Sequence, residues 1–376
     1  MNVTQMSTIL NELVNQKLGE NEIAAIDLTN VVGMGTALGE AIGYDNLVKA
    51  IADKVGYTIL VNREYTSVFP DIHLRDYEYG SILEKIRVDL PDSTANATWG
   101  LNRGDTPNQF EFQPPTVTAK YWNQKNTFSI WYSYSNVQLK EAFQNETTLL
   151  AFFSAIENAI RQAITIREEA NTSIAICNFA LTKSKRNNAC INLLNVYNTE
   201  TNAGLTLANC RRNKEFLRFC AKTIMLYKKR LNSMSTLFNV DGVKTFTPDD
   251  RMRFVMLDEF NKDMEIYLES DTFHNEMVAL SGFETVPYWQ GTGTDYSFAD
   301  ISQMNMKLDG DEQATVLNNV VGVIFDIEAV NINNTNYRVT SAYNAKGEFF
   351  NYFHKYDYML FNDFAENGVV FYLAET

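Results

Sequence analysis

The sequence predicts an α+β fold, in which helices and strands alternate irregularly along the chain. Three observations support this class. Segments with helical and with strand periodicity are interleaved without a regular βαβ period. No proline or glycine occurs from Asn145 to Ala203, which allows one very long helix. The residues before it, 75–135, have extended character and hold four of the seven prolines in the chain.

The composition predicts a folded protein and disfavours two function classes, a general nucleic-acid coat and a protein of the anionic membrane surface. Hydrophobic residues make up 45% of the 376, enough to bury a sizeable core. The net charge of −14 disfavours a general nucleic-acid coat, which needs cations to displace counterions, and also an anionic membrane surface. The N-terminus lacks the pattern of a signal peptide, and the longest apolar run, VVGVIF, cannot span a bilayer. We therefore expect a cytoplasmic origin, no membrane contact and free cysteine thiols.

Residues 1–56 are expected to form two helices joined by a glycine-rich segment. That segment, VVGMGTALGEAIG, places Gly33, Gly35 and Gly39 after two valines and before a helix. Such a turn is typical of dinucleotide-binding sites, but the next strand, YTILVN, ends in Asn and not in an acidic residue. We favour a flexible hinge at these glycines. A cytoplasmic nucleotide-binding enzyme is the alternative.

Residues 57–135 are expected to be extended. YTILVNREYTSVF at 57–69 and TVTAKYWNQKNTFSIWYSYS at 116–135 have the alternation of strands. Between them, PDSTANATWGLNRGDTPNQFEFQPP offers little that could form a core. A compact enzyme seldom keeps such a stretch without a role for it. We predict a long two-stranded arm over 75–135 with an irregular tip.

A helix is predicted over 147–183, because its apolar residues recur on one stripe. At 1.5 Å per residue it would be about 55 Å long, which suits a spine better than a packing unit of a small domain. Further helices are predicted at 213–234 and 261–280. Strands are predicted at Phe254–Leu257, at 318–332 and at 368–376.

Few residues indicate catalysis. The three histidines are not spaced as metal ligands, and no hydrolase, P-loop or metalloprotease motif occurs. We therefore predict no catalytic, metal or cofactor-binding site and no cofactor.

The charge of the chain is unevenly distributed. Residues 183–230 contain eleven Lys and Arg residues but only two Glu residues. We interpret this basic stretch as a face that meets an acidic surface of a neighbouring subunit, with nucleic-acid binding as the alternative.

With these elements in this order, the chain resembles the major capsid proteins of tailed bacteriophages, most closely those of small short-tailed phages. The residues that carry the resemblance are VALSGFETVPYWQG at 278–291, GVIFDIEAV at 322–330 and RVTSAYNAKGEFFNYFHKYDYMLFNDFAENGVVF at 338–371. The resemblance implies a Hong Kong 97-type fold. Its parts would be an N-terminal arm (1–56), an extended loop with peripheral strands (57–135), the spine helix of a peripheral domain (136–190), an axial domain (191–345) and C-terminal strands closing the junction of the two domains (346–376).

The resemblance also implies a structural protein and not an enzyme. Copies would assemble as hexamers and pentamers into the icosahedral head around double-stranded DNA. Further partners would be a separate scaffolding protein, a portal and, in some relatives, a decoration protein, with packaged DNA nearby but not specifically bound. Assembly would occur in the bacterial cytoplasm, and the protein would end in the virion. A head-completion or tail ring protein is a second alternative.

Two sets of aromatic residues are expected to serve this assembly. The arm tip would rest on the next subunit through the anchors and polar partner Trp99, Phe110, Phe112 and Arg103. The stretch FFNYFHKYDYMLFNDF at 349–364 would fill the domain junction with alternate rings, Phe353 and Phe361 among them. Stacking on single-stranded nucleic acid is the alternative for these rings, which the carboxylates in FNDFAEN disfavour.

Overall fold

The computed structural model describes residues 11, 72–74, 82–91, 93, 98–106, 110, 112–135, 137–138, 146–269, 283–289 and 302–375. The two helices predicted in 1–56, and the hinge glycines Gly33, Gly35 and Gly39, lie outside these residues. The chain divides into two compact units. Unit 1 comprises Met1–Glu78, Lys125–Thr172 and Ile332–Leu360, and unit 2 comprises Tyr79–Gln124, Ser173–Asn331 and Phe361–Thr376.

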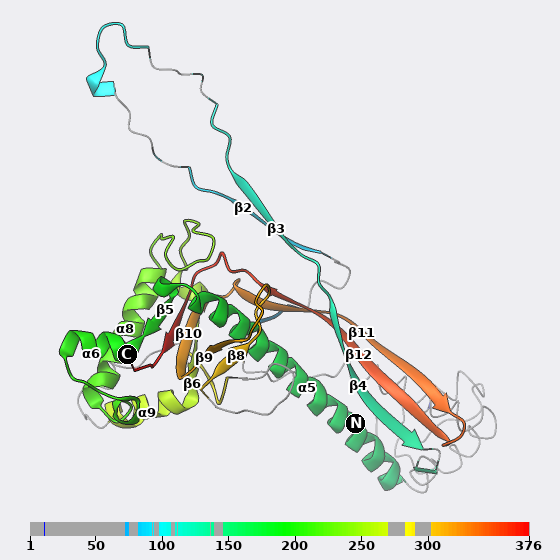
Figure 1. Cartoon of the computed structure of the whole chain (residues 1–376). Helices are drawn as coiled ribbons and strands as arrows, with labels where there is room; N and C mark the ends of the chain where they lie inside the picture. The colour runs from blue at the N-terminus through cyan, green and yellow to red at the C-terminus, as the bar shows by residue number, and fades with distance from the viewer. Residues whose placement is uncertain are drawn as a thin grey trace. The chain divides into compact units, whose positions relative to one another are not determined.

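Unit 1 is built on a four-stranded sheet with the strand order β1-β11-β12-β4. Its strands are β1 (His73–Leu74), β4 (Asn126–Ser135), β11 (Val330–Asn344) and β12 (Phe349–Asn362), of which β11 and β12 each have two residues in unit 2. Strand β1 is parallel to β11, and β12 is antiparallel to β4 (Figure 1). The sheet therefore joins segments that lie more than two hundred residues apart in the sequence.

The aromatic stretch at 349–364 is mainly strand β12, and its side chains alternate between two faces. On one face, Phe350, Tyr352, His354, Tyr356 and Tyr358 are buried, while the residues between them are half-buried. Strand β4 adds Phe128 and Tyr134 to the buried face, and the ring centroids of Tyr134 and Tyr352 lie 5.0 Å apart. This face forms an aromatic core, and most of the polar residues among the rings point away from it.

Helix α5 runs over Glu146–Ser184 and confirms the long helix predicted at 147–183. With 39 residues it is about 58 Å long. The predicted stripe is buried at Ile156, Ile160 and Ile164. In unit 1, Phe152 of this helix meets the ring of Tyr134 edge-on, with centroids 6.1 Å apart, so the helix contributes to the aromatic core.

Unit 2 is built on a five-stranded sheet with the order β5-β13-β10-β6-β7. Its strands are β5 (Cys190–Asn192), β6 (Met252–Leu257), β7 (Glu284–Val286), β10 (Val320–Asp326) and β13 (Gly368–Tyr372). Strand β10 is antiparallel to both of its neighbours and is buried along its whole length, as its apolar sequence requires. The strand predicted at 318–332 is thus two strands, β10 and the start of β11.

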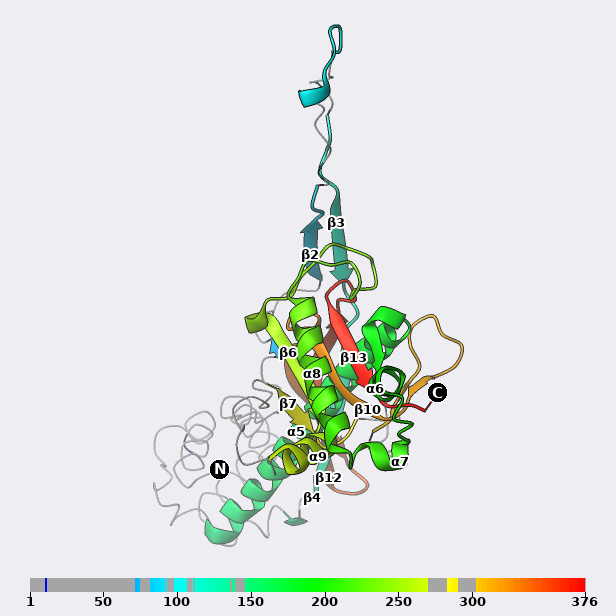
Figure 2. The same cartoon turned by 90° about the vertical axis from the view of Figure 1, so that its left-hand side faces the viewer.

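Helices α6 (Leu193–Thr201), α8 (Lys214–Leu231) and α9 (Asp258–Glu269) accompany this sheet, and α8 contacts both of the others (Figure 2). Helix α8 confirms the prediction at 213–234. Its N-cap is Asn213, whose side-chain oxygen accepts a hydrogen bond from the Phe216 amide, and Lys228–Arg230 favour its C-terminal end. Smaller elements are α7 (Leu207–Cys210), the 3-10 turns Thr98–Gly100, Asn187–Ala189 and Asp249–Arg251, and the antiparallel pair β8 (Met304–Met306) and β9 (Thr315–Leu317).

Unit 2 also contains an antiparallel hairpin of β2 (Leu83–Val88) and β3 (Val117–Trp122), with the register running from Leu83↔Trp122 to Val88↔Val117. The two-stranded arm predicted over 75–135 is therefore correct for this hairpin. It is wrong for residues 126–135, which form β4 and pair with β12. The reason is that Phe128 and Tyr134 are buried on the aromatic face of that sheet.

Burial of His354 predicts that unit 1 loses stability in acid. His354 is 2% exposed, its Nδ1 lies 2.7 Å from the hydroxyl of Tyr337, and burial lowers its pKa to about 4. In the unfolded chain the pKa is near 6.5, so between these pH values only the unfolded chain takes up the proton. Stability should fall by up to about 3 kcal/mol as the pH drops from about 6.5 to about 4.

Urea unfolding of the wild type and of His354→Gln at pH 7 and pH 4.5 measures this effect. The variant should be less stable at pH 7 because of its altered packing, but it should lose clearly less stability between the two pH values. An equal loss in both proteins would show that other groups cause the acid sensitivity.

Candidate assembly interface

The β2–β3 hairpin turns apolar side chains toward solvent and charged side chains toward the rest of unit 2. On the outer face, Ile86, Val88, Val117 and Tyr121 are each more than half exposed. On the inner face lie the cations Lys85, Arg87 and Lys120, together with Leu83, Thr118 and Trp122. A hairpin that served only its own subunit would show the opposite arrangement, so the outer face is a candidate surface for a second molecule.

Two buried carboxylates hold the inner face of the hairpin. Asp363, 2% exposed, lies 2.9 Å from Nζ of Lys85 and 3.1 Å from Nζ of Lys120. Glu366 accepts hydrogen bonds from Lys85 and Arg87 at 2.7 Å each. Because Lys85 and Lys120 are direct cross-strand partners, their charges would repel each other without an anion between them.

The pKa shifts of Lys85 and Asp363 both favour the charged form of each group near neutral pH. Burial lowers the pKa of Lys85, but hydrogen bonds and charges of Glu366 and Asp363 outweigh it and leave the pKa above its usual value. Burial likewise raises the pKa of Asp363, and its contacts with Lys85 and Lys120 outweigh that effect, so the pKa lies below its usual value. Lys85 and Asp363 therefore form a full ion pair.

Lys183, near the end of α5, fixes the turn that carries these carboxylates. Its Nζ donates hydrogen bonds to the carbonyl oxygens of Phe238, Phe364 and Glu366, at 3.0, 3.0 and 2.7 Å. The ammonium group is fully buried and lies over the ring of Phe179. Burial lowers its pKa to about 7, with a partial opposing effect from Asp363 and Glu366. Three carbonyl acceptors match the three donors of a protonated lysine.

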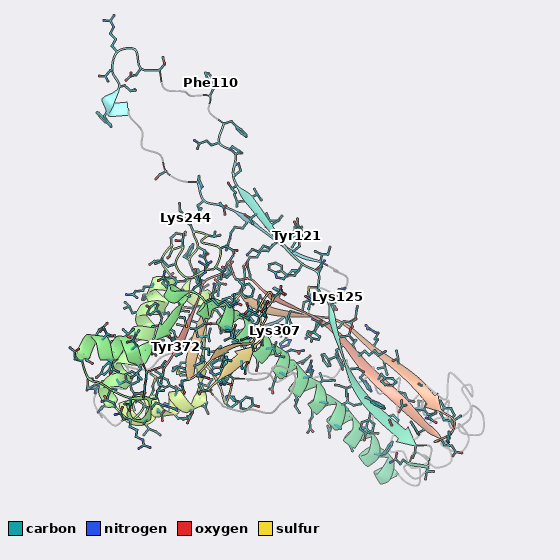
Figure 3. The ribbon with its side chains drawn as sticks, viewed as in Figure 1. Phe110, Tyr121, Lys125, Lys244, Lys307 and Tyr372 are labelled. Atoms are coloured by element: carbon teal, nitrogen blue, oxygen red, sulfur yellow. The ribbon has the colours of Figure 1, made fainter. Side chains whose placement is uncertain are left out.

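The residues predicted as tip anchors are exposed in the structure. Trp99, within a 3-10 turn, is fully exposed, and Phe110 and Phe112 are 86% and 84% exposed. Figure 3 labels Phe110 on this tip. Arg103 is also exposed, and it stands in a tight turn that Asp105 closes by accepting a hydrogen bond from the Asn102 amide at 2.7 Å. Contact of these residues with another subunit stays a prediction.

The residues predicted to fill a domain junction, Phe353 and Phe361, belong to different units. Phe353 lies on the half-buried face of β12, where its ring centroid is 5.9 Å from that of Trp131 and Nζ of Lys355 lies over it. Phe361 is buried in unit 2, with its ring centroid 5.8 Å from that of Trp122. Their junction role stays a prediction.

The basic stretch at 183–230 does not form one uniform cationic face. Lys183 is buried, and ion pairs within unit 2 engage Lys185 with Asp311, Arg211 with Asp263, Arg218 with Glu215 and Lys229 with Asp249. Sequence reasoning missed the partners Asp249, Asp263 and Asp311 because they lie outside this stretch. The predicted contact with an acidic neighbouring surface could use only the remaining charges of this stretch, and it stays untested.

Three further observations concern chemistry in the described part of the chain. No three His, Cys, Asp or Glu side chains gather there as metal ligands would. None of its helices is both long and apolar enough to cross a membrane. None of the four cysteines is in a disulfide in the structure, and Cys177, Cys210 and Cys220 are buried.

The family model and the two solved structures described next all come from bacteriophages. A family model for the Phi29-like phage major capsid protein matches residues 6–372. The structure is similar to a chain of the Staphylococcus phage Andhra capsid, with 11% identity, a TM-score of 0.53 and coverage of 84% of this chain and 86% of that one. A chain in the structure of the head fiber and inner core protein gp22 of bacteriophage P68 gives 11% identity, a TM-score of 0.54 and coverage of 82% and 85%. No curated protein matches this chain. The structural likeness confirms the predicted α+β class as the fold found in phage capsids.

Proposed function

Because the chain belongs to the Phi29-like phage major capsid protein family, we propose that its copies assemble as hexamers and pentamers into the icosahedral head that encloses double-stranded DNA. Family membership makes it a capsid protein of the virion. The subunit acts by closed association with copies of itself, and the role is structural and not catalytic. Each contact can be weak, because every subunit in a shell makes many of them.

The β2–β3 hairpin is the observation that best supports this proposal. Its outer face and its tip expose large apolar side chains, among them Ile86, Trp99, Phe110 and Phe112. A single copy leaves these surfaces in water, which costs about 25 cal/mol for each Å² of apolar area. A neighbouring copy can cover them, and the clustered ion pairs at the base hold the hairpin in position for that contact.

Further partners that we propose are a scaffolding protein, a portal and, where the shell carries one, a decoration protein. Packaged DNA lies inside the shell without specific contacts. The net charge of −14 suits such a wall, because a strongly cationic wall would bind phosphates and resist the movement of DNA during packaging.

Negative-stain electron microscopy of the chain co-expressed with its scaffolding protein tests the proposal. Closed shells of uniform diameter, built from this chain, are expected. Isolated rings alone would favour a head-completion or tail role, and a small oligomer of fixed size that never forms shells would contradict the proposal.

A further inference from the structure

The turn that carries Asp363 and Glu366 is tied to the body of unit 2 from several sides. The amide of Asp363 donates to the carbonyl of Ala329 at 2.8 Å, and the amide of Gly368 donates to that of Phe238 at 3.0 Å. Nζ of Lys183 also donates hydrogen bonds to two carbonyl oxygens of the turn itself, those of Phe364 and Glu366. Backbone bonds and a buried ammonium therefore fix this turn independently of the hairpin.

The hairpin is attached to the same turn in a different way. Among the residues that the structure describes, the backbone hydrogen bonds of β2 and β3 stay within the hairpin. Its contacts with the turn are made by side chains, namely the ion pairs of Lys85, Arg87 and Lys120 and the ring contact of Trp122 with Phe361. Lys120 also pairs with Asp241 at 2.5 Å. The attachment is thus polar, with one aromatic contact at the base of the strand pair.

A cavity of about 270 Å³ lies along this attachment, lined by residues that include Arg87, Asp89, Lys120, Asp241 and Asp363. The space is large enough for several water molecules, and its lining offers them polar partners. This space separates part of the hairpin from the turn, so the two are not packed continuously along their whole contact.

From this asymmetry we propose that the ion-pair cluster is a releasable latch, in which the turn 363–366 is the fixed half and Lys85, Arg87 and Lys120 are the moving half. When the hairpin swings away, the buried carboxylates lose their cations but gain water, because the hairpin is what covers them. Rehydration offsets much of the lost attraction. Unit 2 therefore keeps its fold when the latch opens, and Trp122 against Phe361 marks the pivot.

With such a latch, the exposed hairpin of a single chain can point in either of two directions. The latch depends only on contacts within unit 2, so its test does not depend on shell formation. Opening requires a competing interaction that neutralises or displaces the cations, such as a carboxylate-bearing segment of a second copy of this chain. The chain is rich in such groups, with 46 Asp and Glu against 32 Lys and Arg.

Double electron–electron resonance on the full, unassembled chain tests the latch. Spin labels at Ala119→Cys on the hairpin and Glu200→Cys on α6 occupy two exposed positions of unit 2, in a background carrying Cys190→Ser. The latched protein should give one narrow distance distribution. Lys85→Met with Lys120→Met and Arg87→Met removes all three cations but leaves every bond of the fixed turn, and should broaden the distribution about twofold.

The matched control is Lys185→Met with Arg211→Met and Lys229→Met, which removes the same charge from ion pairs elsewhere in unit 2. The control should keep the narrow distribution. Circular dichroism and thermal unfolding of both triple variants separate release from unfolding. An unchanged distribution in Lys85→Met with Lys120→Met and Arg87→Met would overturn the proposal, and so would broadening that occurs only together with loss of the folded signal.

Discussion

Replacing Lys183 by Met should lower the free energy of unfolding of unit 2 by about 3 kcal/mol, the largest loss that we expect from a single substitution. The methionine keeps the apolar stem against Phe179 but removes all three hydrogen bonds to the carbonyls of Phe238, Phe364 and Glu366. Those carbonyls then stay buried without a donor. Chemical denaturation followed by near-ultraviolet and far-ultraviolet circular dichroism measures this loss of unfolding free energy.

Lys185→Met is the matched control, because Lys185 lies two residues along and pairs with Asp311 at an exposed position. It should cost at most about 1 kcal/mol.

A pH series on the wild type and on Lys183→Met gives a second test. The folded chain releases the Lys183 proton near pH 7 and the unfolded chain near 10.5, so wild-type stability should gain from this group as the pH rises between these values. The Met variant lacks this gain. Equal stability of the Lys183→Met and Lys185→Met variants would show that the side chain of Lys183 is not what fixes the turn.

Removal of the hairpin tip should abolish shell formation while leaving the fold of unit 2 intact. Deletion of residues 95–110 takes away Trp99, Arg103 and Phe110, none of which is buried. The midpoint of thermal unfolding should therefore change by only about 2 °C. In co-expression with the scaffolding protein, sedimentation and negative-stain images should show subunits or small oligomers only, because the anchors of each contact are lost.

A finer variant changes Trp99, Phe110 and Phe112 to Ser and keeps the length of the hairpin. Its control is Phe246→Ser, which removes an exposed ring from another loop of unit 2. We expect assembly to be lost in the triple variant and retained in the control. Normal shells from the deletion variant would refute the role of the tip, and loss of the folded signal would refute its independence from the fold.

Local patterns in the sequence predicted the helices whose buried apolar residues recur at the helical period. Helix α5 follows from an apolar stripe without proline or glycine, and α8 follows from its amphipathic face and from Asn213 at its start. The resemblance to phage capsid proteins, which rested on residues near the C-terminus, agrees with the family that matches residues 6–372.

Long-range pairing could not be predicted in the same way. The alternation in residues 126–135 is equally compatible with an arm and with a sheet, and only the partner strand β12 decides between them. The latch was missed for the same reason, since Lys85 and Asp363 are nearly three hundred residues apart. One signal was present: LEKIRV alternates cations with apolar residues in a strand, which indicates that one face must meet acidic groups.

The place of β13 in unit 2 has a consequence for how the protein is made. This strand, Gly368–Tyr372, stands between β5 and β10, and it pairs Val370 with Cys190. The sheet can therefore close only after this strand has been synthesised, and such distant pairing is slow to find. A chain that lacks residues 368–372 cannot complete this sheet, since β5 and β10 would each lose a hydrogen-bonded neighbour.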